Sequence, residues 1–197
     1  VAGYPLIYLF EKIFRLVSNS KLVELSDTSN TLLRMLADKA PGTFQHSLQV
    51  MNIADAAARA VNANVLLVRA GALYHDIGKT VNPAFFTENQ SGVNPHKNLS
   101  YQQSAQVVIS HITDGLKLAD KHNLPQSIKN FISTHHGKGL TKYFYISCQN
   151  ENPEEDIDKS IFMYPGPNPF TKEQAIMMMA DSVEAASRSM PEYTEEN

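Results

Sequence analysis

The chain has 197 residues, of which 43% are hydrophobic, and a formal net charge of −3. This length suits one domain with an ordinary core. The charge and the absence of a basic run argue against a broad surface for a nucleic-acid polymer, whereas a small anionic ligand is still compatible with a bound metal ion. Cys148 is the only cysteine, so no disulfide can form within the chain and a reducing compartment is expected.

Both ends of the sequence look cut. The chain begins at Val1 rather than methionine, and Thr194 with the acidic residues after it is typical of a helix start, although the sequence ends there. No segment approaches the eighteen or so apolar residues of a membrane span, and no signal peptide is visible. We therefore expect a soluble piece of a longer protein.

The N-terminal part predicts two helices before the first histidine. Apolar residues at helical spacing predict a short helix over residues 6–17. Ser29 or Asn30 is expected to cap the next apolar segment, which Pro41 and Gly42 should end.

Thr43 is then expected to cap a longer helix that reaches about Val61 and carries His46 in its first turn. A protonated histidine is unfavourable for the helix dipole at that place. A neutral His46 bound to a metal ion fits better.

The helix over residues 64–77 delivers a histidine and an aspartate side by side. His75 and Asp76 would point about 100° apart, so they can approach a metal centre from two directions. Gly78 suits the left-handed position that closes a helix, which would leave Lys79 free at the rim to meet an anion. Taken alone, such a pair is more often a dipole-complementing histidine beside a surface carboxylate.

Residues 80–100 are expected to form a loop rich in Asn, Pro and Gly. Loops of about twenty residues are uncommon inside compact domains and are often functional. His96, in the run Asn94-Pro95-His96-Lys97, is a candidate substrate contact. A lone loop histidine is, however, as often structural as functional.

The middle of the chain predicts a pair of helices. Ser100 should cap the first, which runs through Ile112 with His111 near its end, and the second should start at Asp114 and end at His122. His122 lies in a polar C-terminal turn where a histidine suits the helix dipole, so we interpret it as structural.

Pro125 suits the first turn of another helix, which closes with His135, His136 and Gly137. This second helix end with two adjacent ligand-type residues and a glycine repeats the first. Coincidence is a poor explanation for two such ends. The aromatic residues 141–147 could continue as a helix or run as a short extended piece.

The C-terminal part predicts an acidic solvated loop over residues 149–159 and a stiff proline-rich turn over residues 164–169. Thr171 should cap a last helix that reaches about Met190. Asp181 lies in its apolar middle, where a carboxylate is unfavourable unless it is paired or bound to a metal ion. The inward positions of this helix are expected to be Ala175, Met178, Met179, Val183 and Ala186.

There is no sustained β alternation, so the predicted fold class is all-α, a compact bundle with one long loop. The helices are expected to bring together His46, His75, Asp76, His111, His135, His136 and Asp181. Such a set exceeds the needs of one tetrahedral ion, and nitrogen and oxygen ligands without thiolate suit iron or manganese. A carboxylate that bridges two ions supports phosphoester hydrolysis, in which a bridging water becomes hydroxide. Lys79 would add charge stabilisation.

The order of these residues resembles the HD-domain superfamily of metal-dependent phosphohydrolases. The surrounding sequence is more specific, and it looks like the cytoplasmic HD domain of the bacterial seven-transmembrane-receptor HD family over nearly the whole chain. The segments that carry this resemblance are Ala40-Pro41-Gly42-Thr43-Phe44-Gln45-His46-Ser47, Tyr74-His75-Asp76-Ile77-Gly78-Lys79, Glu88-Asn89-Gln90, Asn94-Pro95-His96 and Tyr164-Pro165-Gly166-Pro167.

The resemblance implies a membrane-anchored phosphodiesterase that linearises cyclic di-AMP to 5′-pApA at a di-iron or di-manganese centre. It makes the seven residues metal ligands, with Asp76 as the bridging one. Asp76 and Lys79 are the predicted catalytic residues, and the predicted substrate contacts are Lys79, Asn94, His96 and Tyr164. Tyr164 could stack on a base, although a packing tyrosine in a proline-rich turn is the simpler account. Relatives commonly have an acidic residue where Lys97 stands.

The same resemblance suggests a division of the chain and a location. Residues 1–28 would be a lead-in helix and linker from a removed membrane or sensor part, and residues 29–197 the phosphohydrolase domain. We expect the cytoplasmic domain of a cell-membrane protein that acts in second-messenger signalling. Its partner would be a cyclic dinucleotide, preferably cyclic di-AMP. The sequence leaves the oligomeric state open, and a homodimer is compatible with it.

Two other hypotheses are kept. One is an HD phosphohydrolase of another nucleotide, such as cyclic di-GMP or a nucleoside phosphate, but the GYP signature of the cyclic di-GMP branch is replaced by Gly137-Lys138-Gly139-Leu140. The other is a catalytically silent sensor that binds a nucleotide. The complete ligand set argues against it, because a degenerate site usually loses a ligand.

Overall fold

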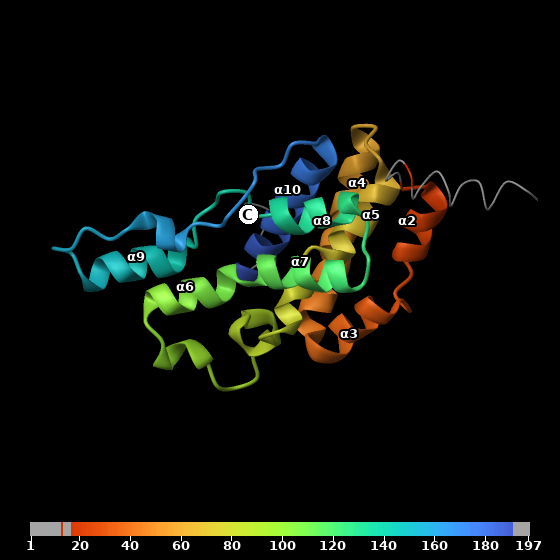
Figure 1. Cartoon of the computed structure of the whole chain (residues 1–197). Helices are drawn as coiled ribbons and strands as arrows, with labels where there is room; N and C mark the ends of the chain where they lie inside the picture. Colours follow the sequence, from red (N-terminus) through yellow and green to blue (C-terminus); the bar gives the residue numbers. More distant parts are fainter. Residues whose placement is uncertain (1–12, 14–16, 191–197) are drawn as a thin grey trace, which may run out of the picture.

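The computed structural model describes residue 13 and residues 17–190, and these form a bundle of α-helices (Figure 1). No strand occurs among them, and one isolated antiparallel bridge joins Leu140 and Met163. The predicted all-α class is confirmed. The helix predicted over residues 6–17 lies almost wholly outside the described residues. None of the described helices has the length and apolar character needed to cross a lipid bilayer.

The described chain consists of α-helices with 3-10 helices at two places, η1 to η4 after α5 and η5 after α9. The α-helices are α2 (Asn19–Leu25), α3 (Thr31–Lys39), α4 (Pro41–Ala60), α5 (Val65–Tyr74), α6 (Tyr101–Ile109), α7 (His111–Lys121), α8 (Gln126–Thr134), α9 (Lys142–Glu151) and α10 (Lys172–Ser189). The 3-10 helices are η1 (Ile77–Thr80), η2 (Pro83–Phe85), η3 (Thr87–Asn89), η4 (Pro95–Asn98) and η5 (Lys159–Phe162).

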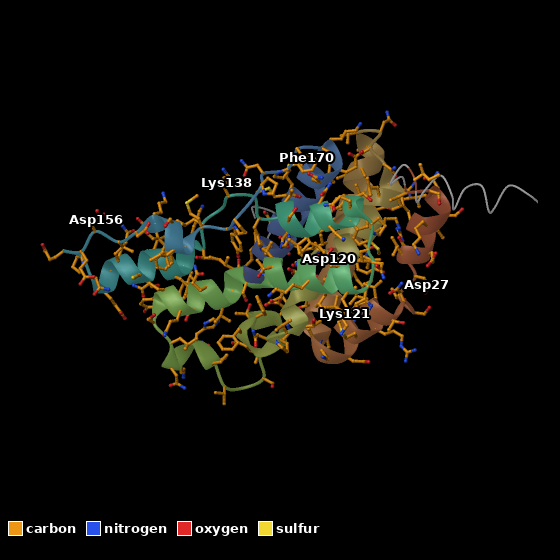
Figure 2. All side chains as sticks on the ribbon, viewed as in Figure 1. Asp27, Asp120, Lys121, Lys138, Asp156 and Phe170 are labelled. Atoms are coloured by element: carbon orange, nitrogen blue, oxygen red, sulfur yellow. The ribbon has the colours of Figure 1, made fainter. Side chains whose placement is uncertain are left out.

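The main core lies around α4 and α5, which pack against each other and against α10. A smaller apolar cluster between α6, α9 and η5 contains Ala105, Ile109, Cys148 and Phe162. Figure 1 shows α6 and α9 side by side at the end of the molecule away from α2. The acidic segment after α9 is mostly exposed, with Asp156 at its outer end (Figure 2). The aromatic residues 141–147, left open from sequence, belong mainly to α9.

Helix α2 falls inside the predicted linker and packs onto the bundle. Its Leu22 and Leu25 side chains are buried in the main core, and the helix contacts α5. The boundary at residue 28 between lead-in and domain stays a prediction.

Several helix starts follow their local sequence. The side chain of Asn30 accepts a hydrogen bond from Leu32 N–H at the start of α3, and Thr171 caps α10. Ser100 forms a capping box with Gln103 at the start of α6. These caps were predictable because each uses neighbours along the chain.

The start of α4 was predicted wrongly. Pro41 opens this helix rather than ending α3, so His46 lies in the second turn and Thr43 is not the cap. No side chain at the N-cap position bonds the first turn, and Asn89 Oδ1, from η3, accepts the Thr43 N–H at 3.1 Å. A residue distant in sequence supplies this contact, which no local pattern could indicate.

Helix α5 ends at Tyr74, earlier than predicted, and η1 follows after His75 and Asp76. Gly78 is not left-handed, because the glycines with positive φ in the described chain are at positions 92, 137 and 166. Gly78 is required for another reason. A Cβ on Gly78 would lie 1.9 Å from the carbonyl oxygen of His111. Close backbone contact between η1 and α7 therefore explains this glycine.

The break between α6 and α7 also differs from expectation. Helix α6 ends at Ile109, and His111 is the first residue of α7, which therefore begins before Asp114. The predicted loop over residues 80–100 is organised by 3-10 helices. Pro125 precedes the first residue of α8 as its N-cap.

The buried face of α10 was misplaced. Met179 and Val183 are 60% and 57% exposed, whereas the buried face includes Ala180, Asp181 and Glu184. Met177, Met178 and Met179 are consecutive, so apolar side chains point from α10 in three different directions. The buried face also contains polar residues, Gln174, Asp181 and Glu184. The spacing of the hydrophobic residues therefore indicated the wrong face of α10 as the buried one.

Candidate metal centre

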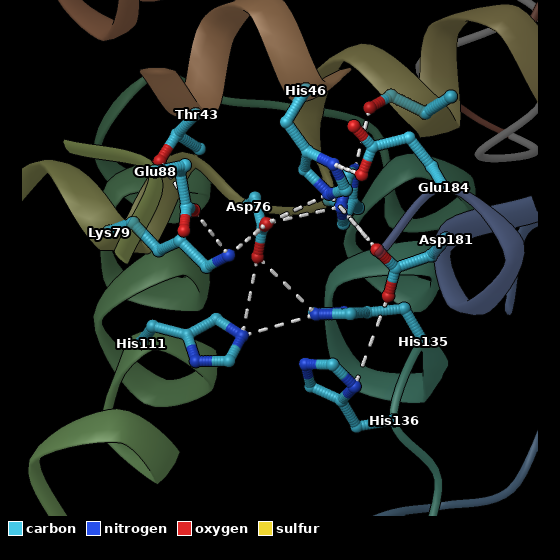
Figure 3. Close-up of polar contacts among 12 residues, drawn as sticks. Thr43, His46, Asp76, Lys79, Glu88, His111, His135, His136, Asp181 and Glu184 are labelled. Carbon is cyan, nitrogen blue, oxygen red and sulfur yellow. Dashed lines mark hydrogen bonds and ion pairs between the residues drawn. The ribbon is translucent and has the colours of Figure 1, made fainter. Parts of the chain in front are cut away.

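The seven predicted ligands meet at one point in the bundle, although five separate parts of the chain supply them (Figure 3). Helix α4 supplies one, the ends of α5 and α8 supply two each, and α7 and α10 supply one each. In that order they are His46, His75, Asp76, His135, His136, His111 and Asp181. All but His136 are buried.

Three of the histidines are fixed in the same way by their own backbone. The Nδ1 atoms of His75, His111 and His135 lie 2.7, 2.6 and 2.9 Å from the carbonyl oxygens of Ala72, Val108 and Ile132. Only a protonated Nδ1 can donate to a carbonyl oxygen, so each neutral ring has its lone pair on Nε2. The Nε2 atoms face the centre of the cluster.

His46 is fixed by a carboxylate instead. Its Nδ1 lies 2.5 Å from Glu184 Oε2, and Glu184 also accepts a hydrogen bond from Arg188 Nε at 3.0 Å. A carboxylate that accepts from the second nitrogen of a metal-binding histidine sets the ring orientation and raises its basicity. Glu184 was not among the residues predicted from the sequence. Its position three residues after Asp181 places both on one face of α10, and that spacing could have indicated it.

Asp76 lies between two groups of imidazole nitrogens (Figure 3). Its Oδ2 is 3.2 Å from His75 Nε2 and 3.6 Å from His46 Nε2. Its Oδ1 is 3.4 Å from His111 Nε2 and 3.5 Å from His135 Nε2. Each carboxylate oxygen therefore faces its own pair of histidines.

The other two ligand candidates complete these groups. Asp181 Oδ1 lies 3.0 Å from His46 Nε2 and 3.8 Å from His75 Nε2, on the first side. His136 joins His111 and His135 on the second side, with ligand atoms within 4.8 Å of one another. With a 29% exposed side chain, His136 is the most exposed of the seven, so the centre opens to solvent beside it.

The donor set fits divalent metal ions. His111 Nε2 and His135 Nε2 are 3.1 Å apart although both carry lone pairs, an arrangement that is repulsive without a cation. Adjacent ligands of an octahedral ion with bonds of about 2.1 Å are separated by about 3.0 Å. In the described part of the chain, His75 Nε2 and Asp76 Oδ1 are also buried without a hydrogen-bond partner. Two metal ions, one on each side of Asp76, would satisfy all of these atoms.

The protonation states suit metal binding as well. Burial lowers the pKa of His111 to about 3 and holds the pKa of His136 well below its usual value, so both are neutral at pH 7. Burial alone would raise the pKa of Asp76, but the charge of Lys79 outweighs it and the pKa is lowered. Burial would lower the pKa of His75, but the charge of Asp76 raises it, so an incoming metal ion would displace a proton from this ring. Neutral imidazole and ionised carboxylate are the forms that bind metals.

Lys79 is not free at the rim, contrary to the prediction. Its Nζ lies 2.7 Å from Asp76 Oδ2 and 2.9 Å from Glu88 Oε1, and its side chain is only 13% exposed. Burial would lower the pKa of Lys79, but the two carboxylates raise it, so the ammonium stays charged. The amine also lies 5.0 Å from the centroid of the Phe86 ring.

Glu88 connects the buried ion pair of Lys79 and Asp76 to the N-terminus of α4. Thr43 Oγ1 donates to Glu88 Oε1 at 3.1 Å, and Asn89 Nδ2 donates to Thr43 Oγ1 at 2.8 Å. The segment Glu88-Asn89-Gln90 carried part of the family resemblance, yet the sequence gave no role for Glu88. A carboxylate in a polar loop looks solvated until its burial is known.

The remaining predicted substrate contacts lie outside the ligand cluster. Asn94 is exposed, and its Oδ1 accepts the His96 N–H at 2.9 Å. Tyr164 stacks on the His136 ring with centroids 4.2 Å apart, so one of its faces is already covered.

His122 is exposed at the end of α7, as its structural interpretation predicts.

Comparison with known proteins agrees with this arrangement. The HD domain family matches residues 43–186. The chain is 46% identical over 195 residues to the cyclic-di-AMP phosphodiesterase PgpH of Listeria monocytogenes serotype 1/2a (strain 10403S), covering 98% of this chain and 27% of that protein. It is 45% identical over 186 residues to the protein of the same name from Bacillus subtilis (strain 168), covering 94% and 26%. The chain thus spans about a quarter of the length of these relatives.

A solved structure shares the fold. The crystal structure of the L. monocytogenes PgpH HD domain in complex with cyclic-di-AMP superposes with a TM-score of 0.80 at 46% identity, covering 84% of this chain and 77% of that one. The family match covers most of the chain, and the predicted ligands lie together inside the matched region. This chain belongs to the HD domain family.

Proposed function

We propose that this domain is a metal-dependent phosphodiesterase that hydrolyses cyclic di-AMP to linear 5′-pApA. The observation that carries the proposal is the position of Asp76, whose two oxygens each face a separate pair of histidines. That arrangement suits a carboxylate bridging two ions. The choice of substrate is supported by relatives named cyclic-di-AMP phosphodiesterase and by the related HD domain in complex with cyclic-di-AMP.

The proposed centre would hold two divalent ions, iron or manganese. One ion would lie with His46, His75 and Asp181, and the other with His111, His135 and His136. When bound, such ions would supply Lewis acidity and activate a water nucleophile. The absence of a nearby thiolate favours these metals over softer ones.

The protein's own part is to hold ligands in place and to balance charge. Hydrogen bonds at Nδ1 fix the rings of His46, His75, His111 and His135 before metal or substrate arrives. Two divalent ions would more than neutralise Asp76 and Asp181, while Lys79 and Glu88 cancel each other. The centre would then carry net positive charge, which suits a phosphodiester.

Lys79 has a narrower role in this proposal than the sequence suggested. Its ammonium already contacts Asp76 and Glu88, so it orients the bridging carboxylate and neutralises buried charge. Its contact with a phosphate oxygen, like the substrate contacts of Asn94, His96 and Tyr164, stays a prediction. We also keep as proposals the cytoplasmic location on a membrane-anchored protein and the homodimer.

Product analysis tests the function. Protein purified without oxygen and loaded with manganese or iron is given cyclic di-AMP and cyclic di-GMP in parallel, and the products are separated by chromatography. We expect 5′-pApA from cyclic di-AMP, and no product after metal removal by a chelator. Product from cyclic di-GMP alone would shift the function to another nucleotide. No product from either, with two metals bound, would support a sensor.

A further inference from the structure

His136 lacks the anchor that holds the other ligand histidines. Those four rings are each held at Nδ1 by a hydrogen bond to a backbone carbonyl oxygen or to a carboxylate. Within the described part of the chain, the polar contact of the His136 ring runs from Nδ1 to Asp181 Oδ2 at 4.0 Å, which is too long for a hydrogen bond (Figure 3). Its side chain is also 29% exposed, so packing encloses it less than it encloses the other ligands.

Aromatic rings hold His136 instead. The Tyr164 ring stacks on it, with centroids 4.2 Å apart and an angle of 27° between the planes. The centroid of the His135 ring is 4.1 Å away, and the His111 ring meets His136 edge-on at 5.3 Å. Aromatic pairs at such separations attract each other. Since the other two rings are themselves predicted ligands, Tyr164 is the support in this group that binds no metal.

Tyr164 is fixed by backbone hydrogen bonds near the segment that follows His136. Its N–H donates to the carbonyl oxygen of Gly139 at 2.9 Å, and the Thr141 N–H donates to the carbonyl oxygen of Phe162 at 2.8 Å. Phe162 is fully buried in the apolar cluster between α6, α9 and η5. The backbone that carries the stacking ring is therefore held in place without the help of a metal ion.

The side of the centre that contains His136 has fewer charged ligands than the other side. The His46 side contains Asp181 Oδ1, which lies 3.0 Å from His46 Nε2, in addition to Asp76 Oδ2. The other side consists of three histidines and Asp76 Oδ1. Affinity for a divalent ion depends on the number of charged ligands. The ion on the His136 side should therefore be the weaker bound of the two.

We propose that Tyr164 is a positioning residue for this second ion, and that its ring holds His136 where the imidazole can join His111 and His135. The inference rests on the two-metal centre of the proposed function. Without the ring, His136 would be free to turn, and metal binding would have to order it at a cost in affinity. This role uses the face of Tyr164 that lies against His136 and needs no substrate, so it is separate from the predicted stacking on a base.

Two substitutions separate the ring from the hydroxyl group. Tyr164→Phe keeps the stacked ring, whereas Tyr164→Leu keeps an apolar side chain without a ring. Manganese is titrated into the metal-free domain, and calorimetry gives the affinity for each ion. Tyr164→Leu should weaken the second, weaker binding step by about three- to ten-fold, the effect of ordering one side chain on binding, and leave the first step unchanged. Tyr164→Phe should match the wild type in both steps.

Phe170→Leu is the matched control. It also replaces an aromatic ring by leucine, at a 62% exposed position that follows the same proline-rich turn, and it should change neither step. Tyr164→Val lacks the ring as well and should behave as Tyr164→Leu does. It takes over the test if the leucine variant does not fold.

Electron paramagnetic resonance gives a readout that a general loss of stability would not produce. At a manganese concentration that just fills both sites of the wild type, the two ions should give the spectrum of an exchange-coupled pair. Tyr164→Leu should add the spectrum of an isolated ion, because the first site stays filled while the second empties. In crystals at that concentration, the weakened anomalous peak should be the one beside His111, His135 and His136.

Three results would overturn the inference: equal affinities in Tyr164→Leu and the wild type, equal weakening of both steps in folded Tyr164→Leu, or a loss in Tyr164→Phe as large as that in Tyr164→Leu. If the wild type hydrolyses cyclic di-AMP but the second ion does not depend on the ring, the inference fails and the function stands. If the second ion depends on the ring but no cyclic dinucleotide is hydrolysed, the function fails and the positioning role stands.

Discussion

The metal centre and a cavity of about 910 Å³ beside it, between α6, α9 and the segment that follows η1, both use histidines that are anchored to the backbone, but through opposite nitrogens. At the metal centre, His75, His111 and His135 donate from Nδ1 to carbonyl oxygens of their own helices and present Nε2. At the cavity, His96 donates from Nε2 to Phe85, and its Nδ1 is buried without a hydrogen-bond partner in the described part of the chain. The comparison shows that the backbone partner of a histidine decides which nitrogen keeps its lone pair.

The two regions also differ in charge. The centre contains Asp76, Lys79 and Glu88 as a nearly buried ionic chain, with Asp181 and Glu184 on its other side. The cavity is lined by aromatic rings together with polar residues, of which Glu88, Lys97 and Glu151 carry charge. Substitutions at the centre should therefore act through metal binding and folding stability.

The largest expected effect is that of Asp76→Ala. It removes the carboxylate that faces both groups of histidines, so activity should fall by roughly 10³-fold or more because the ions lose their shared ligand. Circular dichroism should show that the helical fold is retained. Asp120→Ala, at a 69% exposed position, serves as the control. Wild-type activity in metal-loaded Asp76→Ala would exclude the bridging role.

Glu184→Gln tests whether the carboxylate beside His46 supports metal binding. The variant keeps an acceptor oxygen for His46 Nδ1 but removes the negative charge, so affinity should fall by about ten- to a hundred-fold for the ion on the His46 side. Competition with a chelator measures the affinity. Glu24→Gln, at a 64% exposed position on α2, should leave it unchanged. Equal metal affinity in Glu184→Gln and the wild type would make Glu184 a packing residue only.

Lys79→Met tests the ionic chain through folding stability. It leaves Glu88, with a 7% exposed side chain, as an uncompensated buried charge, so the metal-loaded domain should lose about 3 kcal/mol of unfolding free energy. Adding Glu88→Gln to this variant should restore part of the loss, because the unpaired charge is removed. Urea unfolding measures both. Additive losses in the double variant would show that the two residues do not interact.

The smallest effect concerns pH. Burial would raise the pKa of Glu88, but Lys79 outweighs it and the pKa is lowered from 4.5. The stabilisation by ionised Glu88 is therefore present above pH 4.5 and is lost as the pH falls below it. In urea unfolding at pH 7, the free energy of unfolding of the wild type should be about 1–2 kcal/mol higher than that of Glu88→Gln. This difference in stability should disappear as the pH is lowered. A difference that widens below pH 4.5 would contradict the lowered pKa.

Features of the sequence that act locally were predictable, and those that depend on distant contacts were not. The helix starts at Asn30, Ser100 and Thr171 followed from neighbouring residues. The first turn of α4 is bonded by Asn89, and Gly78 is needed for the approach of α7, so both were misread.

The candidate site also has features that the local sequence indicated and features that depend on tertiary packing. The adjacent pairs at residues 75–76 and 135–136 marked the metal centre, and the family resemblance supplied the full set of ligands. Glu88 and Glu184 were missed because a carboxylate in a loop or on a helix is usually solvated, and only tertiary packing buries them. The cavity could not be predicted because α9 and the segment around His96 are far apart in sequence.

The most direct test of the central claim is the position of bound metal. A crystal of the manganese-loaded domain, measured at the manganese absorption edge, should give two anomalous peaks on either side of Asp76. We expect one peak beside His46, His75 and Asp181, and the other beside His111, His135 and His136. A single peak, or peaks that Asp76 does not join, would contradict a two-metal centre bridged by this residue.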